Sequence, residues 1–300
     1  MKLTKAVFCI ALLVVAGSSC IREDFDDCLS RNYLVLSYKG DGTTEIFPDK
    51  INRVEMFVFD SENNCVNSSA LSQDEVEGRK VMLPPLAAGD YRIVCVGNTY
   101  DTEFDGLSSG DFSEMIFAAS SYYDEERISG NDSLYYASTY YTVEPFDPRE
   151  NDHVQVMEFA CSHYDLLVEA SGVPEPGTKA ASGPVLEICG VSPCTDFENR
   201  ACGESADYLL ETEYDASQAK LTARTNIMRH EDHENVVVRL SYESDDEALA
   251  EVNLAEFLAE HPVIDCSKQE VLIPISIEFK SGNVSIDVPG WYVEQIKPEF

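Results

Sequence analysis

The sequence predicts a mainly β protein with two antiparallel β-sandwich domains in tandem. Three observations lead to this fold class. In most apolar segments, hydrophobic residues alternate with polar ones at a period of two, which is typical of half-buried strands. Helical patterns are few. A segment rich in Pro, Gly and Ser divides a chain of 300 residues, which is long enough to form two separate cores.

The chain begins with a segment typical of a secretory signal peptide. Lys2 and Lys5 precede an almost wholly apolar stretch from residue 6 to residue 17. This stretch has roughly 12 residues, against the ~20 that a membrane-spanning helix needs. We therefore expect residues 1–19 to be a signal peptide that is removed.

A cysteine, Cys20, follows this signal directly. The small residues Gly17, Ser18 and Ser19 precede it, and this order resembles the lipobox of bacterial lipoproteins, where the peptidase cuts before a cysteine that carries diacylglycerol. The leucine often found three places before that cysteine is missing. We expect lipid on Cys20 and an acidic tether over residues 20–30. The alternative is an ordinary cleavage site that leaves Cys20 as a structural thiol.

The formal net charge of −34 limits the classes of partner. Nucleic acid and anionic lipid headgroups would both be repelled by so acidic a chain. We therefore expect no nucleic-acid partner, and a surface that favours solubility outside the cell.

The cysteine count favours disulfides in an exported protein. Of the ten cysteines, Cys9 lies in the signal and Cys20 at the anchor, which leaves an even number. The candidates for disulfides are Cys28, Cys65, Cys95, Cys161, Cys189, Cys194, Cys202 and Cys266. Their pairing stays open, although Cys189, Cys194 and Cys202 are close enough in sequence for a local bridge. A zinc site in that cluster lacks the usual pairs of closely spaced cysteines.

Four segments supply the predicted core strands. Their inward faces are Val54, Met56 and Val58; Tyr91, Ile93 and Cys95; Val236, Val238, Leu240 and Tyr242; and Ile273, Ile275, Ile277 and Phe279. The last of these strands pairs with a strand that contains Val284, Ile286 and Val288, through a hairpin turn at Ser281 and Gly282. Because Pro274 has no amide donor, we expect its strand to lie at an edge or to begin at a bulge.

Helical signals and one linker complete the predicted organisation. Asp111 can cap a short helix, and Leu254, Phe257 and Leu258 share one face of another. Residues 172–184 are rich in Pro, Gly and Ser and read as a linker. We therefore expect an N-terminal sandwich over residues 31–171 and a C-terminal sandwich over residues 185–300.

The order of these segments resembles the fimbrillin-A-associated anchor protein family of Bacteroidetes fimbriae. The matching pieces are the cysteine followed by "IREDFDDC", "FVFD" at residues 57–60, "LPPLAAGDYRIVCVGN" at residues 83–98, "LYYAS" at residues 134–138 and "VPGWYV" at residues 288–293. Each of these motifs alone has little specificity. The resemblance depends on their order and spacing along the chain. The cysteines from Cys189 to Cys202 depart from the family pattern.

The resemblance implies a surface-exposed outer-membrane lipoprotein with two transthyretin-like sandwiches, which attaches a fimbrial stalk to the cell. Cys20 corresponds to the lipid-bearing cysteine and Cys28 to the second cysteine of the acidic leader. Gly290 and Trp291 match a closing Gly-Trp. The expected partners are stalk subunits and the outer membrane, and the expected mechanism is completion of a sheet by a strand from the first stalk subunit.

The sequence contains few candidate groups of catalytic residues. We therefore expect that the protein is not an enzyme and binds neither a cofactor nor a metal ion. His230, Glu231, Asp232 and His233 lack the HExxH spacing and read as a solvated loop. The segment "ACSHYD" could place a thiolate nucleophile at Cys161, with His163 as its base. We favour a disulfide role for Cys161 over this catalytic interpretation.

A tyrosine-rich segment provides the alternative function. Its members are Tyr122, Tyr123, Tyr135, Tyr136, Tyr140 and Tyr141. Such side chains could bind glycan or host protein, because tyrosine combines an apolar face with a polar tip. Core and edge packing is favoured, since adjacent tyrosines on a strand point to opposite faces.

Overall fold

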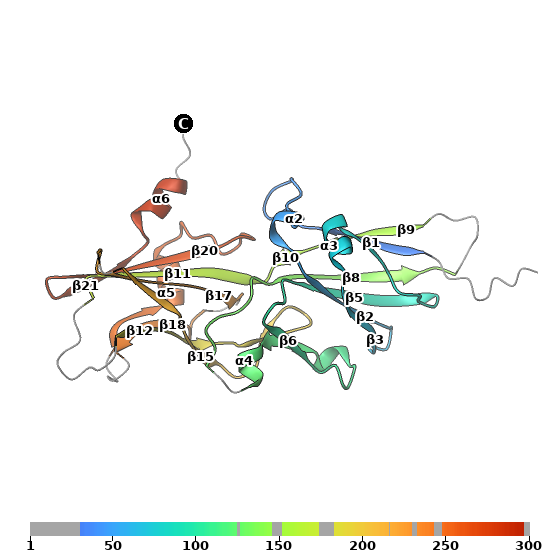
Figure 1. Ribbon diagram of the computed structural model, residues 1–300, viewed down its shortest axis with the longest axis horizontal. Helices are drawn as coiled ribbons and strands as arrows, with labels where there is room; N and C mark the ends of the chain where they lie inside the picture. Colours follow the sequence, from blue (N-terminus) through green and yellow to red (C-terminus); the bar gives the residue numbers. More distant parts are fainter. Residues whose placement is uncertain are drawn as a thin grey trace, which may run out of the picture.

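The protein is described by a computed structural model (Figure 1). The described residues are 31–124, 127–145, 152–173, 183–215, 217–229, 233–242 and 248–296. The predicted signal peptide, Cys20, the tether and Cys28 lie outside them. Strands dominate the described chain, so the predicted mainly β class is confirmed. Among the described residues, no helix is long and apolar enough to cross a membrane.

The N-terminal sandwich packs a three-stranded sheet, sheet A, against a five-stranded sheet, sheet B. Sheet A contains, in spatial order, β4 (Lys80–Met82), β1 (Asn32–Ser37) and β9 (His153–Glu158). Sheet B contains β10 (Ala160–Cys161), β8 (Tyr135–Val143), β5 (Gly89–Gly97), β2 (Val54–Phe59) and β3 (Cys65–Ala70). The β1–β9 pair is parallel, whereas the other strand pairs of these two sheets are antiparallel.

The central strands of sheet B are buried on both faces. Val54, Met56 and Val58 point into the core between the sheets, as predicted. Phe57 and Phe59 alternate with them and enter a second core on the opposite face. This double burial explains why the strand reads as a nearly continuous apolar run, although only one face was assigned from its alternation.

A third layer covers that opposite face. Its sheet D contains, in spatial order, β14 (Ala201–Cys202), β13 (Cys194–Asp196), β7 (Ile116–Ala119) and β6 (Thr102–Asp105). The β13–β14 hairpin comes from the C-terminal half of the chain, yet it pairs with β7 from the N-terminal half. Sheet D therefore joins the two halves.

The C-terminal sandwich consists of two further sheets. Sheet F contains β16 (Thr212–Asp215), β17 (Lys220–Met228), β11 (His163–Ser171), β20 (Leu272–Lys280) and β21 (Asn283–Asp287). Sheet E contains β15 (Ala206–Leu209), β12 (Pro184–Val191), β18 (Val237–Tyr242) and β19 (Ala248–Asn253). The predicted inward faces around Val238, Leu240, Ile273, Ile275 and Ile277 form its core.

The chain changes sandwiches earlier than we expected. β11 was placed in the N-terminal unit, but it is the central strand of sheet F, between β17 and β20. Only Ser162 separates it from β10 of sheet B, so the crossing lies there and not in segment 172–184. The Pro, Gly and Ser composition of that segment marks a connection between two strands of the second sandwich. Most of the segment lies outside the described residues.

The hairpin predicted at Ser281 and Gly282 is confirmed. Both residues have positive φ, 50° and 85°, and Lys280 pairs with Asn283 across them, as a two-residue turn requires. Pro274 lies in β20, which is not an edge strand. Because β21 pairs only from Ser276 onward, the strand has one neighbour at Pro274, which is where a missing donor is tolerated.

Helices are short and connect the strands. They are α2 (Phe47–Lys50), α3 (Gln73–Gly78), the 3₁₀ helix η1 (Phe112–Glu114), α4 (Ser120–Tyr123), α5 (Leu254–Glu260) and α6 (Gly290–Ile296). Asp111 caps η1 as predicted, and α5 buries Leu254 and Phe257. α3 was missed, although Ser72 and Glu75 form a capping box at its start, which is a readable signal.

Candidate functional site: the junction of the sandwiches and the open sheets

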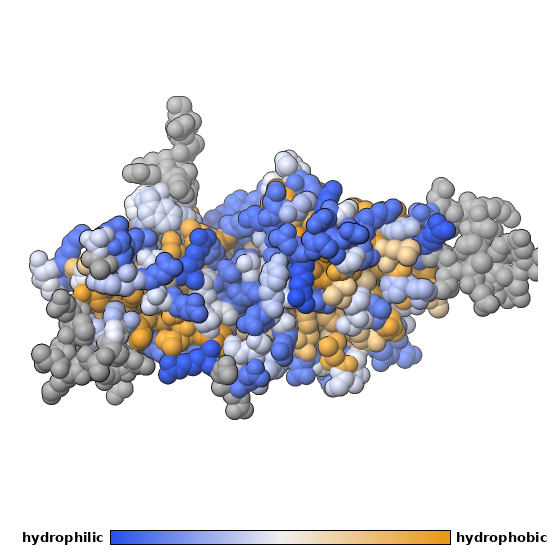
Figure 2. Space-filling view, in the orientation of Figure 1, coloured by the Kyte–Doolittle hydropathy of each residue, from blue (hydrophilic) through white to orange (hydrophobic). Residues whose placement is uncertain are grey.

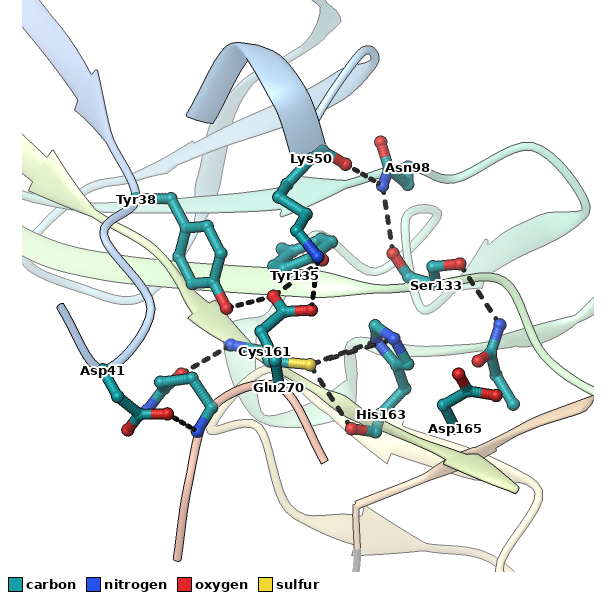
Figure 3. A network of polar contacts seen from close by, with 12 residues as sticks. Tyr38, Asp41, Lys50, Asn98, Ser133, Tyr135, Cys161, His163, Asp165 and Glu270 are labelled. Carbon is teal, nitrogen blue, oxygen red and sulfur yellow. Dashed lines mark hydrogen bonds and ion pairs between the residues drawn. The ribbon is translucent and has the colours of Figure 1, made fainter. Parts of the chain in front are cut away.

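A carboxylate lies at the centre of the polar junction between the two sandwiches (Figure 3). Glu270, in the loop before β20, accepts hydrogen bonds from the hydroxyls of Tyr38 (2.5 Å) and Tyr135 (3.1 Å). The ammonium of Lys50 lies 2.8 Å from its other oxygen. All three partners belong to the N-terminal sandwich, so one acidic side chain of the C-terminal half binds three of its groups.

The electrostatics of this junction follow from burial and pairing. Burial alone would raise the pKa of Glu270, but the hydrogen bonds from Lys50 and Tyr38 outweigh it and hold that pKa below its usual value. Burial, together with the hydrogen bond to Glu270, raises the pKa of Tyr38. The carboxylate is therefore ionised and the phenol neutral at neutral pH, which is the state that this hydrogen bond needs.

Further polar contacts extend the junction. The backbone amide of Gln269 donates to Asp41 (2.9 Å), and the side-chain oxygen of Gln269 accepts from the amide of Cys161 (2.8 Å). The side chain of Asn98 donates to the carbonyls of Lys50 (2.8 Å) and Ser133 (3.1 Å). The loop that carries Glu270 is thus also held at Gln269, whereas Asn98 joins two segments of the N-terminal half.

Cys161 and His163 do not form a nucleophile and its base. The imidazole Nδ1 lies 2.9 Å from the carbonyl of Leu134, to which it donates, so it has no lone pair for the thiol 3.3 Å away. Burial lowers the pKa of His163 and raises that of Cys161 to about 11. Both groups are neutral at neutral pH, which is the opposite of an activated thiolate.

A cleft of about 560 Å³ opens beside this network. Four of its charged lining groups are already paired with each other. Glu270 binds Lys50, and Arg224 donates to Asp165 with its Nε at 2.9 Å. Such mutual pairing is typical of a structural junction rather than of a site that holds a charged ligand.

A second link joins the halves through sheet D. The guanidinium of Arg92 on β5 makes two 2.8 Å hydrogen bonds to Glu198 in the β13–β14 hairpin. The same guanidinium lies 3.9 Å from the ring centroid of Phe112 and 5.6 Å from that of Tyr140. Beneath it, the buried Phe197 ring contacts several other phenylalanine rings at centroid distances of 5.0 to 6.2 Å.

The outer face of sheet A exposes several apolar side chains, and Lys80 lies over the ring of Tyr33 there, 4.1 Å from its centroid. Met82, Val154 and Val156 are 58%, 55% and 57% exposed. They flank the partly exposed Tyr33 and Val35 of β1 in register. We call these five residues the sheet A face. Figure 2 shows apolar residues gathered on the N-terminal sandwich around β1 and β9. Several exposed apolar side chains in adjacent rows of one sheet are typical of a contact surface.

The cysteines predicted for disulfides are spread over the molecule. All seven described ones, Cys65, Cys95, Cys161, Cys189, Cys194, Cys202 and Cys266, are free thiols in the structure. Cys95 lies in the N-terminal core and Cys161 at the junction. Cys194 and Cys202 lie directly opposite each other on β13 and β14. The local cluster predicted from sequence thus brings together one pair, without Cys189.

Most side chains of the tyrosine-rich segment lie in the interior, in agreement with the favoured interpretation of core and edge packing. Tyr135, Tyr136 and Tyr141 are buried, and Tyr140 is 76% exposed. His230, Glu231 and Asp232, which were expected to form a solvated loop rather than a metal site, lie outside the described residues. Among the residues that are described, no group of three or more His, Cys, Asp or Glu side chains could hold a metal ion.

Sequence reasoning missed the residues that make both links. Glu270, Lys50, Arg92 and Phe197 carry no local motif, because their partners lie far away in the sequence. Because acidic residues outnumber basic ones, the sequence could have suggested that most Lys and Arg side chains form ion pairs. It does not indicate which acidic residue pairs with each of them.

Comparison with known proteins adds the family. The chain matches the fimbrillin-A associated anchor proteins Mfa1 and Mfa2 over residues 25–297. No curated protein matches the sequence at a significant level.

Solved structures share the fold at low identity. A candidate adhesin from Bacteroides ovatus has a TM-score of 0.69 at 15% identity, over 88% of this chain and 95% of that chain. The fimbrial anchor protein Mfa2 from Porphyromonas gingivalis has a TM-score of 0.66 at 10% identity, over 86% and 95%. A candidate polysaccharide-binding protein from Bacteroides thetaiotaomicron has a TM-score of 0.66 at 11% identity, over 88% and 99%.

Because the family match extends over nearly the whole chain, both sandwiches included, the protein belongs to the family of fimbrillin-A associated anchor proteins.

Proposed function

We propose that the protein is a lipid-anchored fimbrial subunit that attaches a fimbrial stalk to the outer membrane. The observation that carries this proposal is the family match over residues 25–297, which begins a few residues after Cys20 and its lipobox-like setting. The family is one of fimbrial anchor proteins and not of enzymes, and membership implies a location at the cell surface, associated with fimbriae. Lipid on Cys20 would supply the membrane attachment, since acyl chains anchor a protein without a spanning helix.

Strand complementation is the proposed mechanism of attachment to the first stalk subunit. An added strand pairs its backbone with an open edge, and its side chains contact neighbouring apolar surface. Sheet A offers β4 and β9 as its outer strands, and both border the exposed sheet A face. We therefore place the incoming segment at sheet A.

Replacement of Cys20 tests the anchor. In cells that carry Cys20→Ala, we expect fimbrial protein to move from washed cells into the medium together with this protein. Cys28→Ala is the matched control, because it removes the other leader cysteine and leaves the lipid site intact. Release of this protein alone, with the fimbriae still on the cells, would contradict the anchoring role.

A charge on sheet A tests the mechanism. Val156→Lys places a charge where an apolar strand would lie, and we expect recovery of the stalk complex to fall by tenfold or more, a factor that corresponds to about 1.4 kcal/mol. Val284→Lys on β21 is the control, because Val284 is also exposed, at 44%, but lies on the other sandwich. An equal loss of the stalk complex in both variants would contradict binding of the incoming strand at sheet A.

The glycan-binding alternative has less support in the structure. The tyrosines that could stack on sugars are mainly interior, and the exposed Tyr140 already lies near Arg92. We therefore retain the fimbrial function alone.

A further inference from the structure

Two cysteines face each other in the short hairpin of sheet D. Cys194 on β13 and Cys202 on β14 are direct partners in the antiparallel ladder. Directly opposite residues in such a ladder have Cα atoms about 4.5–5.5 Å apart. Disulfides need Cα atoms about 4.4–6.8 Å apart. The backbone of the hairpin therefore already has the spacing of a disulfide.

The side chains point toward each other as well. Each thiol is the largest influence on the pKa of the other, lowering that of Cys194 and raising that of Cys202. Gly203 follows Cys202 with a φ of +81°, and a Cβ atom there would lie 2.8 Å from the sulfur of Cys194. A glycine at this position therefore leaves the space that the Cys194 sulfur occupies.

The surroundings favour reaction of this pair. The hydrogen bond from Cys202 lowers the pKa of Cys194 to about 7 against the opposing effect of burial, and the hydroxyl of Tyr122 adds to the lowering. A thiolate is the form that attacks a disulfide. Cys194 is buried, whereas Cys202 is partly exposed, so one sulfur is accessible to an oxidant and the other is ready to complete the bond.

The other described cysteines have no such partner. Across their ladders, Cys65 faces Phe59, Cys161 faces Tyr135 and Cys189 faces Val237. Burial raises the pKa of Cys189 to about 11. Within the described part of the chain, Cys194 and Cys202 are thus the one pair in which two cysteines oppose each other.

We propose that Cys194 and Cys202 form a disulfide after export, by exchange with the disulfide of a thiol–disulfide oxidoreductase. The two S–H bonds break and one S–S bond forms between the Sγ atoms. The two electrons and two protons reduce the disulfide of the oxidoreductase to a dithiol. The product closes the hairpin that carries Phe197 and Glu198, both of which contact the N-terminal half of the chain.

Peptide mapping of the full-length protein tests the bond. The protein is isolated from the membranes of cells that export it, blocked with N-ethylmaleimide and digested with trypsin without reductant. Cleavage after Arg200 separates residues 180–200, which contain Cys194, from residues 201–220, which contain Cys202. We expect the two peptides to be linked, and to separate on reduction.

Substitutions identify the cysteines. Because Cys189 lies in the same tryptic peptide as Cys194, Cys189→Ser is the matched control and must keep the link, whereas Cys194→Ser and Cys202→Ser must lose it. N-ethylmaleimide on both Cys194 and Cys202 of the unsubstituted protein would overturn the proposal. A link that disappears in Cys189→Ser would also overturn it.

Thermal unfolding supplies a second readout that does not require a variant. Reductant should lower the melting temperature of the unsubstituted protein by roughly 5 °C or more, because the cross-link constrains the unfolded chain. The Cys202→Ser protein should melt near the reduced value and not respond to reductant. A melting temperature that reductant leaves unchanged in the unsubstituted protein would contradict a stabilising bond.

Discussion

The N-terminal sandwich is joined to the C-terminal half of the chain by two links that differ in chemistry. The polar junction gathers Tyr38, Tyr135 and Lys50 around Glu270. The aromatic link buries Phe197 among phenylalanine rings under a single ion pair at its rim. Burial of apolar area stabilises without regard to direction, whereas hydrogen bonds to a carboxylate exchange with bonds to water and require defined geometry. The aromatic link should therefore supply more free energy, and the polar junction more orientation and more dependence on pH.

The largest effect should come from Phe197→Ala. Phe197 is 1% exposed, and loss of a buried phenylalanine ring typically costs about 3–5 kcal/mol of unfolding free energy, through lost burial and the cavity left behind. Urea unfolding measures it. Tyr214→Ala is the control, because Tyr214 is an aromatic residue that is 59% exposed. Should the alanine variant not fold, Phe197→Leu gives a smaller loss in the same direction. A loss below about 1 kcal/mol for Phe197→Ala would mean that the aromatic link is not the stronger one.

Glu270→Leu should have the next largest effect, roughly 2 kcal/mol. Two tyrosine hydroxyls and one ammonium lose their acceptor, and the groups that remain buried pay for their desolvation. Glu270→Gln keeps an acceptor oxygen and should lose about half as much. Glu278→Gln is the control, because Glu278 pairs with the exposed Lys280 and surface pairs contribute at most about 1 kcal/mol. Equal losses at positions 270 and 278 would show that the polar junction adds nothing beyond surface pairing.

The pH dependence of the same site gives a third prediction. The pKa of Glu270 in the folded protein lies below its ordinary value of 4.5, so its contribution is complete above about that pH and is lost as the pH falls through the folded pKa. Because other carboxylates also titrate there, the useful quantity is the difference in melting temperature between the unsubstituted protein and Glu270→Gln. This difference should be present at pH 7 and shrink as the pH falls below 4.5 and through the folded pKa. A difference that grew at acid pH would reverse the assigned direction.

The smallest effect should be the coupling between Arg92 and Glu198. Glu198 is 44% exposed, so a double-mutant cycle with Arg92→Gln and Glu198→Gln should give about 0.5–1 kcal/mol. The exposed pair Arg239 and Glu251 provides a second cycle for comparison, with a smaller expected value because it lacks the ring contacts of Arg92. A larger coupling at Arg239 would mean that the aromatic rim does not strengthen the pair.

Local patterns predicted the parts of the fold that depend on local rules. The alternation of Val54, Met56 and Val58 identified a core face, since side chains on a strand alternate in direction whatever the strand later contacts. Ser281 and Gly282 predicted a two-residue turn because few residues adopt positive φ at low cost. These rules act within a few residues, so the sequence contains them in readable form.

Contacts between distant segments were not readable in the same way. Phe197 looks like any strand or turn residue until the β13–β14 hairpin is seen to cover sheet B, and Glu270 looks like one acid among many. The boundary between the sandwiches was misplaced because loop composition was used to find it, whereas the segment that crosses between them, residues 160–171, contains neither Pro nor Gly. Lipid on Cys20 stays a prediction.

The near continuity of β10 and β11 has a mechanical consequence. A force that pulls the sandwiches apart along the long axis of the molecule (Figure 1) passes through one extended segment. In sheet F, β11 lies between β17 and β20 over most of its length, and ladder hydrogen bonds run across the strand direction. Tension along β11 therefore loads these bonds in shear, and they must break together rather than one after another. The strand that crosses between the sandwiches is thus held in the C-terminal sandwich at a position where pulling it out of sheet F is most strongly resisted.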